Sequence, residues 1–335
     1  MNKFFCADAC RGAGEDIIGS GTNYGTYVLI EHSGIWDFDA LNSQNIPDNL
    51  KQYIAEIKQS GLSLRFLLIK QHKPQSQTGH RIIIYDQTQA KFSSGYEKFE
   101  FKVEHLEQVS RVVKDYLQGK ASQFEVQPSH TRDILVCTHG SHDKCCAKYG
   151  IPFYMESLKT LSELKLQNVQ IWKASHFGGH RFAPTCIDFP DGRYYGLLDQ
   201  TALRSILTRK GDIECFNRVY RGWGILPTDI QCLERELILL HGWQWFKYKI
   251  AAPEIKKHSD DTKITVSLVY QASNSRTYHC DAELVKDDHK TMELKGSCEA
   301  QTSWLFVKYA VKSFHLTLEL ESPVQFKSFS ENKAS

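Results

Sequence analysis

The pattern of apolar and polar positions divides the chain into the elements of a mixed α/β fold. Runs rich in β-branched and apolar residues predict strands at 24–32, 62–70 and 81–86. Between the first two runs, residues 49–61 have the apolar spacing of a helix and end at Gly61, a suitable C-cap. This order predicts a small N-terminal α/β lobe, with a further helix expected at 101–119.

The middle of the chain carries the clearest pattern. It predicts a buried strand at 133–137, a polar loop at 138–144, a helix at 146–164 and a strand at 169–175. Strands at 185–188 and 193–197 are expected to form a hairpin closed by Pro190-Asp191-Gly192, and a helix is expected at 201–209. The order β-α-β-β-β-α is typical of a thioredoxin-like sheet, although other α/β folds share it.

The last third begins with an amphipathic helix, expected at 229–241, and continues as alternating stretches at 263–271, 276–283 and 316–321. This β-rich region contains no residue pattern that suggests chemistry. We therefore predict an N-terminal α/β lobe at 1–128, a thioredoxin-like domain at 129–250, a β-rich appendage at 251–325, and a disordered polar tail at 326–335.

Composition limits the class of protein. A net charge of +2, 41% hydrophobic residues and 24% charged residues are typical of a soluble globular protein, and indicate no nucleic-acid partner. The apolar runs are too short to cross a bilayer, and polar residues interrupt the N-terminus before a signal-peptide core could form. We therefore expect a cytoplasmic protein with no membrane contact.

Ten cysteines are too few for a disulfide scaffold of this length, and they are unevenly placed. In a reducing compartment, the adjacent pair Cys145 and Cys146 favours metal or redox chemistry. Isolated cysteines are more often small buried apolar side chains, and that interpretation is applied to five of them: Cys186, Cys215, Cys232, Cys280 and Cys298.

Four residues form the candidate site. Cys137 ends a predicted strand, and Cys146 begins a predicted helix after eight intervening residues, where the helix dipole favours a thiolate. His176 and His180 flank Gly178-Gly179. In a strand, two residues four apart would be separated by about 13 Å. A tight Gly-Gly turn is therefore expected to bring both imidazoles to one metal.

Several neighbours leave alternatives open. Cys145 competes with Cys146, and the residues alone do not decide between them. His139 and His142 could support the ligands by hydrogen bonds or replace one of them. Arg181 is expected to be an electrostatic partner of a negatively charged cluster. The two charged residues before the cysteine pair are expected on the loop surface: Asp143 and Lys144.

Residues 134–147 (Ile-Leu-Val-Cys-Thr-His-Gly-Ser-His-Asp-Lys-Cys-Cys-Ala), 175–184 (Ser-His-Phe-Gly-Gly-His-Arg-Phe-Ala-Pro) and 190–196 (Pro-Asp-Gly-Arg-Tyr-Tyr-Gly) resemble the sucrase/ferredoxin-like family. The resemblance is dense from about 132 to 200 and weaker at 25–36 and 221–222. It implies a thioredoxin-like [2Fe-2S] ferredoxin in which a C-x8-C pair and an H-x3-H pair bind the cluster. Those pairs fall on Cys137, Cys146, His176 and His180, so the resemblance favours Cys146 over Cys145.

This ligand set implies a one-electron transfer protein. Rieske centres, which also have two Cys and two His ligands, have potentials of about −150 to +300 mV, against about −400 mV for plant-type ferredoxins. A potential above plant-type ferredoxins and dependent on pH is therefore expected. The chain has no Gly-x-Gly-x-x-Gly nucleotide fingerprint, so the electron donor and acceptor are expected to be external.

Three other functions compete with electron transfer. A structural Cys2His2 zinc site is the main alternative, but structural zinc sites usually separate paired cysteines by two to four residues. Hydrolysis requires two carboxylates in a cleft, whereas Asp188 and Asp191 flank a predicted hairpin turn. A thiol oxidoreductase using Cys145 and Cys146 would lack the Cys-x-x-Cys motif.

Overall fold

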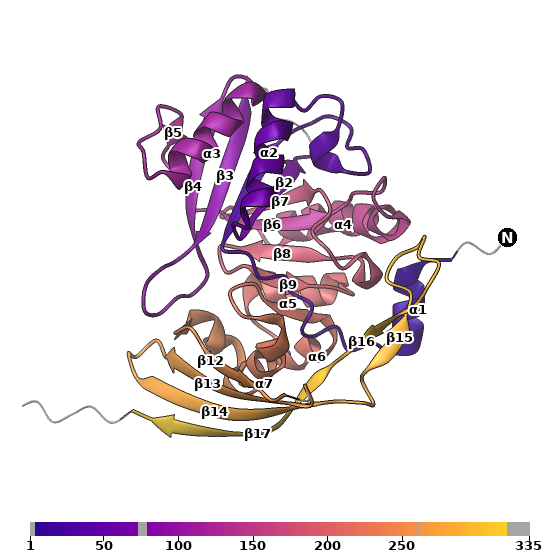
Figure 1. The fold of residues 1–335 in the computed structure, drawn as a ribbon, viewed down its shortest axis with the longest axis vertical. Helices are drawn as coiled ribbons and strands as arrows, with labels where there is room; N and C mark the ends of the chain where they lie inside the picture. The colour runs from indigo at the N-terminus through magenta and orange to yellow at the C-terminus, as the bar shows by residue number, and fades with distance from the viewer. Residues whose placement is uncertain (1–3, 73–78, 260, 320–335) are drawn as a thin grey trace, which may run out of the picture.

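The computed structural model describes residues 4–72, 79–259 and 261–319, which fold around one ten-stranded mixed sheet (Figure 1). Along the sheet the strands follow the order β10-β9-β8-β6-β7-β2-β1-β3-β4-β5. Their bounds are β1 (Thr26–Glu31), β2 (Leu64–Lys70), β3 (His80–Gln87), β4 (Tyr96–Val103), β5 (Glu125–Val126), β6 (Arg132–Cys137), β7 (Val169–Ala174), β8 (Cys186–Phe189), β9 (Arg193–Tyr195) and β10 (Tyr220–Trp223).

The described residues also form α-helices. They are α1 (Cys6–Ala13), α2 (Asp48–Ser60), α3 (Val109–Leu117), α4 (Ile151–Glu163), α5 (Gln200–Thr208), α6 (Phe216–Val219) and α7 (Gln231–His241). A π-helical turn, Cys146–Gly150, leads directly into α4. None of the described helices is both long and apolar enough to cross a bilayer.

The two halves of the large sheet repeat one topology. The first half runs β1-α2-β2-β3-β4-α3 and the second runs β6-α4-β7-β8-β9-α5. In each half the first two strands are parallel and the next two add antiparallel partners. The halves join where β2 and β7 pair antiparallel, with Ile69 opposite Ala174. The chain is thus a mixed α/β protein, and the β-α-β-β-β-α order expected for its middle is confirmed.

The predicted helix at 101–119 is wrong at its start. Residues 96–103 form β4, which pairs with β3 along its length, and the helix α3 begins only at Val109. Phe101 and Val103 are buried while Lys102 between them is exposed, so the apolar period here is two, as in a strand. The short helix α1 was not anticipated, whereas the other predicted helices are confirmed to within a few residues.

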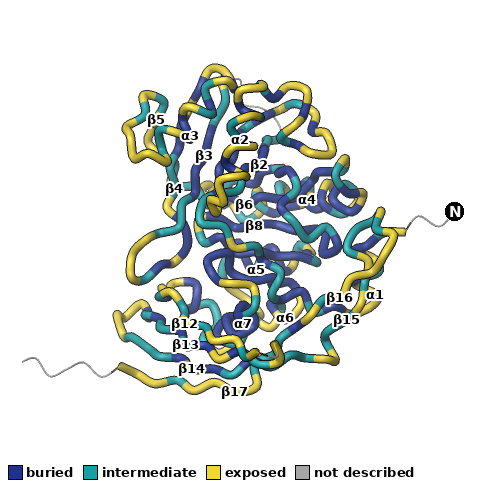
Figure 2. Tube along the Cα trace, viewed as in Figure 1, coloured by how far each residue is buried: buried dark blue, intermediate teal, exposed yellow. Residues whose placement is uncertain are grey.

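Each half of the sheet buries one face under its own pair of helices. Val28 and Ile30 of β1 pack in one core with Leu50 of α2 and Val112 of α3. The opposite face of this half joins the core of the second half (Figure 2). There the ring of Tyr85 stacks on that of Phe189, with 4.3 Å between the ring centroids. The two halves therefore share one continuous interior.

The C-terminal region is β-rich, as predicted. A five-stranded sheet comprises β11 (Lys249–Ile250), β12 (Glu254–Lys257), β13 (Lys263–Gln271), β14 (Thr277–Lys286) and β17 (Tyr309–Leu318), and it packs against α7 (Figure 1). Of the strand predicted at 316–321, residues 316–318 are the end of β17, which begins at Tyr309, and residues 320–321 lie outside the described residues. A separate hairpin, β15 (Met292–Leu294) and β16 (Trp304–Phe306), lies beside α1. The expected disordered tail, 326–335, lies outside the described residues.

One buried carboxylate ties the two halves together. Asp133 of β6 is only 1% exposed. It accepts hydrogen bonds of 2.7 Å from both Lys98 Nζ of β4 and Trp172 Nε1 of β7, and a third from the hydroxyl of Tyr85. A carboxylate this deeply buried is stable only when its oxygens are paired in this way.

We predict that Asp133→Ala will lower the free energy of unfolding by about 3 kcal/mol, because it leaves Trp172 Nε1 and the Tyr85 hydroxyl without their acceptor in the interior and removes one of the two carboxylates that pair with Lys98. Urea denaturation followed by tryptophan fluorescence measures the change. Asp48→Ala is the matched control, because the Asp48 carboxylate lies in solvent beside Lys51. If both variants have the same midpoint, Asp133 does not join the halves.

Candidate metal centre

The four candidate ligands come together at one edge of the second half of the sheet. Cys137 is the last residue of β6, and His176 follows the end of β7, its parallel neighbour. Parallel neighbours end at the same edge, so these two residues lie side by side. Cys146 begins the π-helical turn before α4, and His180 begins a short 3-10 helix after the Gly-Gly turn.

The donor atoms form an elongated set. His176 Nδ1 lies 3.7 Å from Cys137 Sγ and 3.7 Å from Cys146 Sγ, and the three atoms form one compact group. His180 belongs instead to a second compact group, with His142 and His176. The two thiols therefore lie at one end, His180 lies at the other, and His176 is common to both groups.

The Gly-Gly turn expected between the histidines is present. Gly178 and Gly179 have φ of 98° and 81°, in the left-handed region that disfavours other residues. A Cβ on Gly179 would lie 2.5 Å from the guanidinium of Arg221, which also donates to the Gly178 carbonyl at 3.2 Å. The turn sets the centroids of the two imidazole rings 5.0 Å apart, stacked at 30°.

The surroundings favour the metal-binding protonation state at Cys137 and at both histidines, whereas the hydrogen bond to Cys137 and burial raise the pKa of the Cys146 thiol. A hydrogen bond from the Cys146 thiol, with further backbone N–H groups and the charge of Arg221, holds the pKa of Cys137 below its ordinary value. Burial lowers the pKa of both His176 and His180, which keeps the imidazoles neutral. A thiolate and neutral imidazoles are the forms that coordinate metal ions.

The hydrogen bonds of His180 leave one ring nitrogen available. Its Nε2 donates to the carbonyl oxygen of Gly296 at 2.7 Å, so Nδ1 carries the lone pair. That Nδ1 is buried and has no hydrogen-bond partner among the described residues. A histidine that gives one N–H to a carbonyl while its other nitrogen is unpaired has the arrangement of a metal ligand.

Two histidines of the loop support His176. The backbone N–H of His176 donates to His139 Nδ1 at 3.2 Å, while His139 Nε2 donates to the carbonyl of Asp37 at 2.7 Å. His139 thus holds the ligand loop in place with both ring nitrogens occupied. The ring of His142 stacks on that of His176, with 4.0 Å between centroids, so His142 covers one face of the ligand.

The expectation for Arg181 is wrong, and Arg221 takes the expected place. Arg181 donates to the buried carboxylate of Glu15 at 2.7 Å and lies over the ring of Phe306. Arg221, in β10, lies directly under the Gly-Gly turn and is almost fully buried, which lowers its pKa to about 10. No local pattern connects Arg221 with the histidines, because only the sheet brings them together.

The structure separates the two adjacent cysteines. Cys146 faces Cys137 and His176, whereas the Sγ of Cys145 lies 3.5 Å from that of Cys6 and 3.3 Å from that of Cys298. A hydrogen bond from Cys6 lowers the pKa of Cys145 to about 7. Cys298 is therefore not the isolated apolar side chain expected from the sequence.

Asp143 also differs from the expectation of a surface residue. It is 6% exposed, and its carboxylate accepts the backbone N–H groups of Cys145 at 2.8 Å and Cys298 at 3.0 Å. These buried N–H groups require an acceptor, which explains why the carboxylate points inward. Lys144 is exposed as expected and pairs with Glu299 at the surface.

The two carboxylates considered for hydrolysis form ion pairs with arginines. Asp188 receives Arg132 Nε at 2.7 Å, and Asp191 receives a guanidinium nitrogen of Arg209 at 2.7 Å. These two carboxylates, the candidates for hydrolysis, are thus held in ion pairs behind the hairpin. They have the role of turn and core residues rather than of a paired acid and base.

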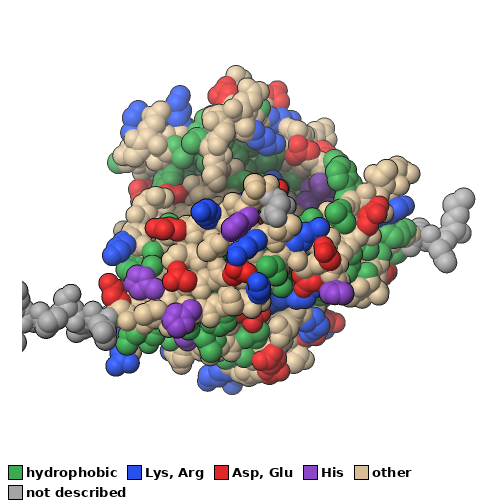
Figure 3. Space-filling view, turned by 60° about the horizontal axis from the view of Figure 1, so that its bottom comes forward, with side chains coloured by type: hydrophobic (Ala, Val, Ile, Leu, Met, Phe, Trp, Pro, Cys, Tyr) green, Lys and Arg blue, Asp and Glu red, His purple; other side chains and the backbone are tan. Residues whose placement is uncertain are grey.

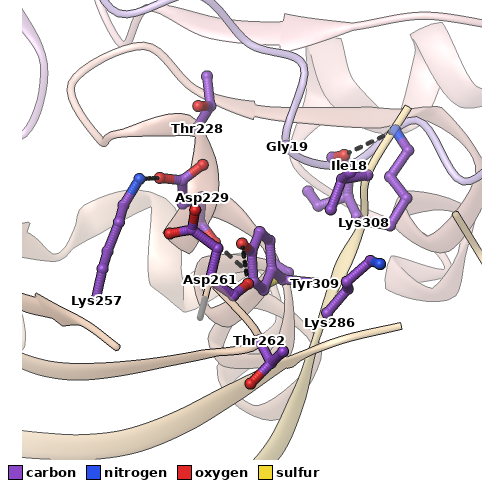
Figure 4. A pocket seen from close by; sticks show the side chains of 12 residues that line it. Ile18, Gly19, Thr228, Asp229, Lys257, Asp261, Thr262, Lys286, Lys308 and Tyr309 are labelled. Carbon is purple, nitrogen blue, oxygen red and sulfur yellow. Dashed lines mark hydrogen bonds and ion pairs between the residues drawn. The ribbon is translucent and has the colours of Figure 1, made fainter. Parts of the chain in front are cut away.

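A separate cavity of about 460 Å³ lies between α7 and the C-terminal sheet (Figure 4). Its lysines are paired: Lys257 with Asp229, Lys308 with Glu15, and Lys286 with the exposed Asp288. Because acidic side chains neutralise these ammonium groups, the cavity does not present a strong positive charge to an anion.

The comparisons with known proteins gave a family match. The family model described as sucrase/ferredoxin-like matches residues 17–222, a segment that contains all four candidate ligands. Searches of curated proteins and of solved structures found no match. Since the matched segment is more than half of the 335 residues, the chain belongs to the sucrase/ferredoxin-like family.

Proposed function

We propose that this protein transfers single electrons and holds a [2Fe-2S] cluster through Cys137, Cys146, His176 and His180. The observation that carries the proposal is the elongated donor set, with two thiols at one end and the unpaired Nδ1 of His180 at the other. A two-iron cluster needs donors at two separate points, in the manner of Rieske centres. Such a cluster supplies one-electron exchange at a potential above plant-type ferredoxins.

A single zinc ion fits the same residues less well. Zinc–sulfur and zinc–nitrogen bonds of about 2.3 and 2.0 Å require all four donors to lie within about 3.8 Å of one another. His180 groups with His142 and His176 rather than with the two thiols. The spacing of donors therefore supports the cluster over a Cys2His2 zinc site.

The remaining residues of the centre position the ligands and balance their charge. Gly296 fixes the orientation of His180, and His139 fixes the loop that carries His176. The guanidinium of Arg221 lies under the Gly-Gly turn, where its charge opposes the negative charge of two thiolates. Each of these groups holds a ligand in one orientation before any metal binds.

The fold we propose for the centre is thioredoxin-like, on the basis of its β-α-β-β-β-α order. The N-terminal half repeats this topology but has no cysteine between Cys10 and Cys137. It therefore has no thiol at the position corresponding to Cys137. We propose that this half supports the centre and contributes to the surface that a redox partner contacts.

The partner is proposed to approach where His176 meets solvent. His176 and His142 line a cavity of about 480 Å³, whose lining also includes Phe38, Leu62 and Arg65. Phe38 is 64% exposed and Leu62 is 53% exposed. Elsewhere, on the face drawn in Figure 3, acidic and basic side chains are interspersed. The mixed charge on that face and the exposed apolar side chains at the cavity support an external protein or small-molecule redox partner, and not a nucleic acid or a membrane.

We predict that Cys146→Ser and Cys137→Ser will lose most of the iron and acid-labile sulfide, because serine is a poor cluster ligand. Iron and sulfide analysis of protein purified without oxygen measures this loss. Cys280→Ser, at a cysteine buried in β14, is the control and should retain both. A colourless wild-type protein with stoichiometric zinc at these residues would contradict the proposed cluster.

We also predict that His180→Cys will retain the cluster but lower its midpoint potential by a few hundred millivolts, since about that interval separates Rieske from plant-type centres. The dependence of the potential on pH should flatten, because one titratable N–H is lost. Redox titrations at several pH values measure both effects. His279→Ala, at a half-exposed histidine of β14, is the control: it should keep the wild-type potential within a few tens of millivolts. An unchanged potential and pH dependence in His180→Cys would exclude His180 as a ligand.

A further inference from the structure

A second group of donors lies on the other side of the cysteine pair. The Sγ atoms of Cys6, Cys145 and Cys298 form a triangle with sides of 3.5, 3.3 and 3.6 Å. An oxygen of Asp143 lies 3.2 Å from Cys298 Sγ and 3.9 Å from Cys6 Sγ. These four donors form one compact group, and none of them belongs to the proposed cluster.

We propose that Cys6, Asp143, Cys145 and Cys298 bind one tetrahedral zinc ion. With zinc–sulfur bonds of about 2.3 Å and zinc–oxygen bonds of about 2.0–2.2 Å, a tetrahedron has edges of about 3.8 Å between sulfurs and about 3.5 Å between sulfur and oxygen. The three sulfur–sulfur distances are somewhat shorter than this edge, and the two sulfur–oxygen distances lie on either side of theirs, so small side-chain movements would complete the site. Unlike the elongated set at the first centre, all four donors converge on one point.

Other occupants of this group fit the distances less well. A disulfide requires a sulfur–sulfur distance of about 2.05 Å, and it would leave the third thiol unpaired. A [4Fe-4S] cluster binds each thiolate to a different iron, which sets the sulfurs much farther apart than the sides of this triangle. A single ion with soft thiolate ligands is the arrangement that three sulfurs in mutual contact support.

The surroundings of the group resemble the outer shell of a metal site. The backbone N–H of Ala7 donates to Cys145 Sγ at 3.4 Å, a bond that favours a thiolate. Backbone N–H groups of Cys145 and Cys298 orient the Asp143 carboxylate. Ligands whose orientation is fixed by hydrogen bonds are typical of structural metal centres.

The proposed ion would join three distant parts of the chain. Cys6 lies on α1, Asp143 and Cys145 precede α4, and Cys298 lies in the loop between β15 and β16, beside α1 (Figure 1). That same loop carries Gly296, whose carbonyl orients His180. The ion would therefore hold in place the segment that orients His180, while none of its own ligands belongs to the first centre.

The test is the metal content of the full chain, produced with zinc and iron supplied. We expect one zinc per chain in addition to cluster iron. Cys298→Ser should lose that zinc and keep iron and acid-labile sulfide, whereas the control Cys280→Ser should keep all three. Cobalt exchanged into the wild-type protein should give the d–d bands of a tetrahedral ion and a sulfur-to-cobalt charge-transfer band, both absent from Cys298→Ser.

Three results would overturn the proposal: wild-type protein without zinc, full zinc in Cys298→Ser, or a native disulfide between two of the three cysteines in mass spectrometry. If Cys298→Ser is insoluble, the cobalt spectrum of the wild type decides, since an octahedral or sulfur-free spectrum excludes the site. Failure of the proposed function gives a different result. If the proposed function fails, wild-type protein contains no iron, but it still contains this zinc, and Cys298→Ser still loses it.

Discussion

The close packing of Gly150 against the end of β6 is the constraint on which the chemistry of this protein depends. A Cβ at Gly150 would lie 2.0 Å from the carbonyl oxygen of Cys137, so only glycine allows the π-helical turn to approach the strand. This approach brings Cys146 to Cys137. Because consecutive residues of a helical turn point in different directions, it also directs Cys145 to the opposite side, toward Cys6 and Asp143. One turn thus supplies a thiol to each of two donor groups.

The N-terminal half of the sheet has no cysteine, but it holds in place the loop that leads into this turn. Backbone carbonyls of residues 36–38 accept hydrogen bonds from the loop at 138–144: Trp36 from the Ser141 hydroxyl, Asp37 from His139, and Phe38 from His142. Behind the loop, the Asp133 network and the stacked rings of the shared core keep the halves in register. The two halves share one topology but have different roles. The second half carries the candidate ligands, and the first half holds the loop at 138–144 in place.

Much of the fold and the proposed ligand set follows from local sequence, and the differences have identifiable causes. Long periodic runs predicted most strands and helices. The helix expected from residue 101 failed because a short alternation of apolar and charged residues is ambiguous between the two periods. The choice of Cys146 over Cys145 rested on the family resemblance. The two side chains point in different directions because of the π-helical turn, and the sequence pattern does not predict that turn. The sequence did not predict that Cys6 and Cys298 lie beside Cys145. An isolated cysteine cannot be distinguished from a small apolar residue until the fold shows which side chains surround it.

The position of Gly296 has a consequence for the order in which the protein matures. Synthesis proceeds from the N-terminus, and domains commonly begin to fold as they leave the ribosome. The segment matched by the family model ends at residue 222, well before the loop that carries Gly296 and Cys298. The strands beneath the first centre are therefore synthesised before Gly296, whose carbonyl orients His180. Until the loop between β15 and β16 has folded, His180 lacks the carbonyl that fixes its orientation, so we expect metal binding by the proposed ligands to be complete only after this loop is in place.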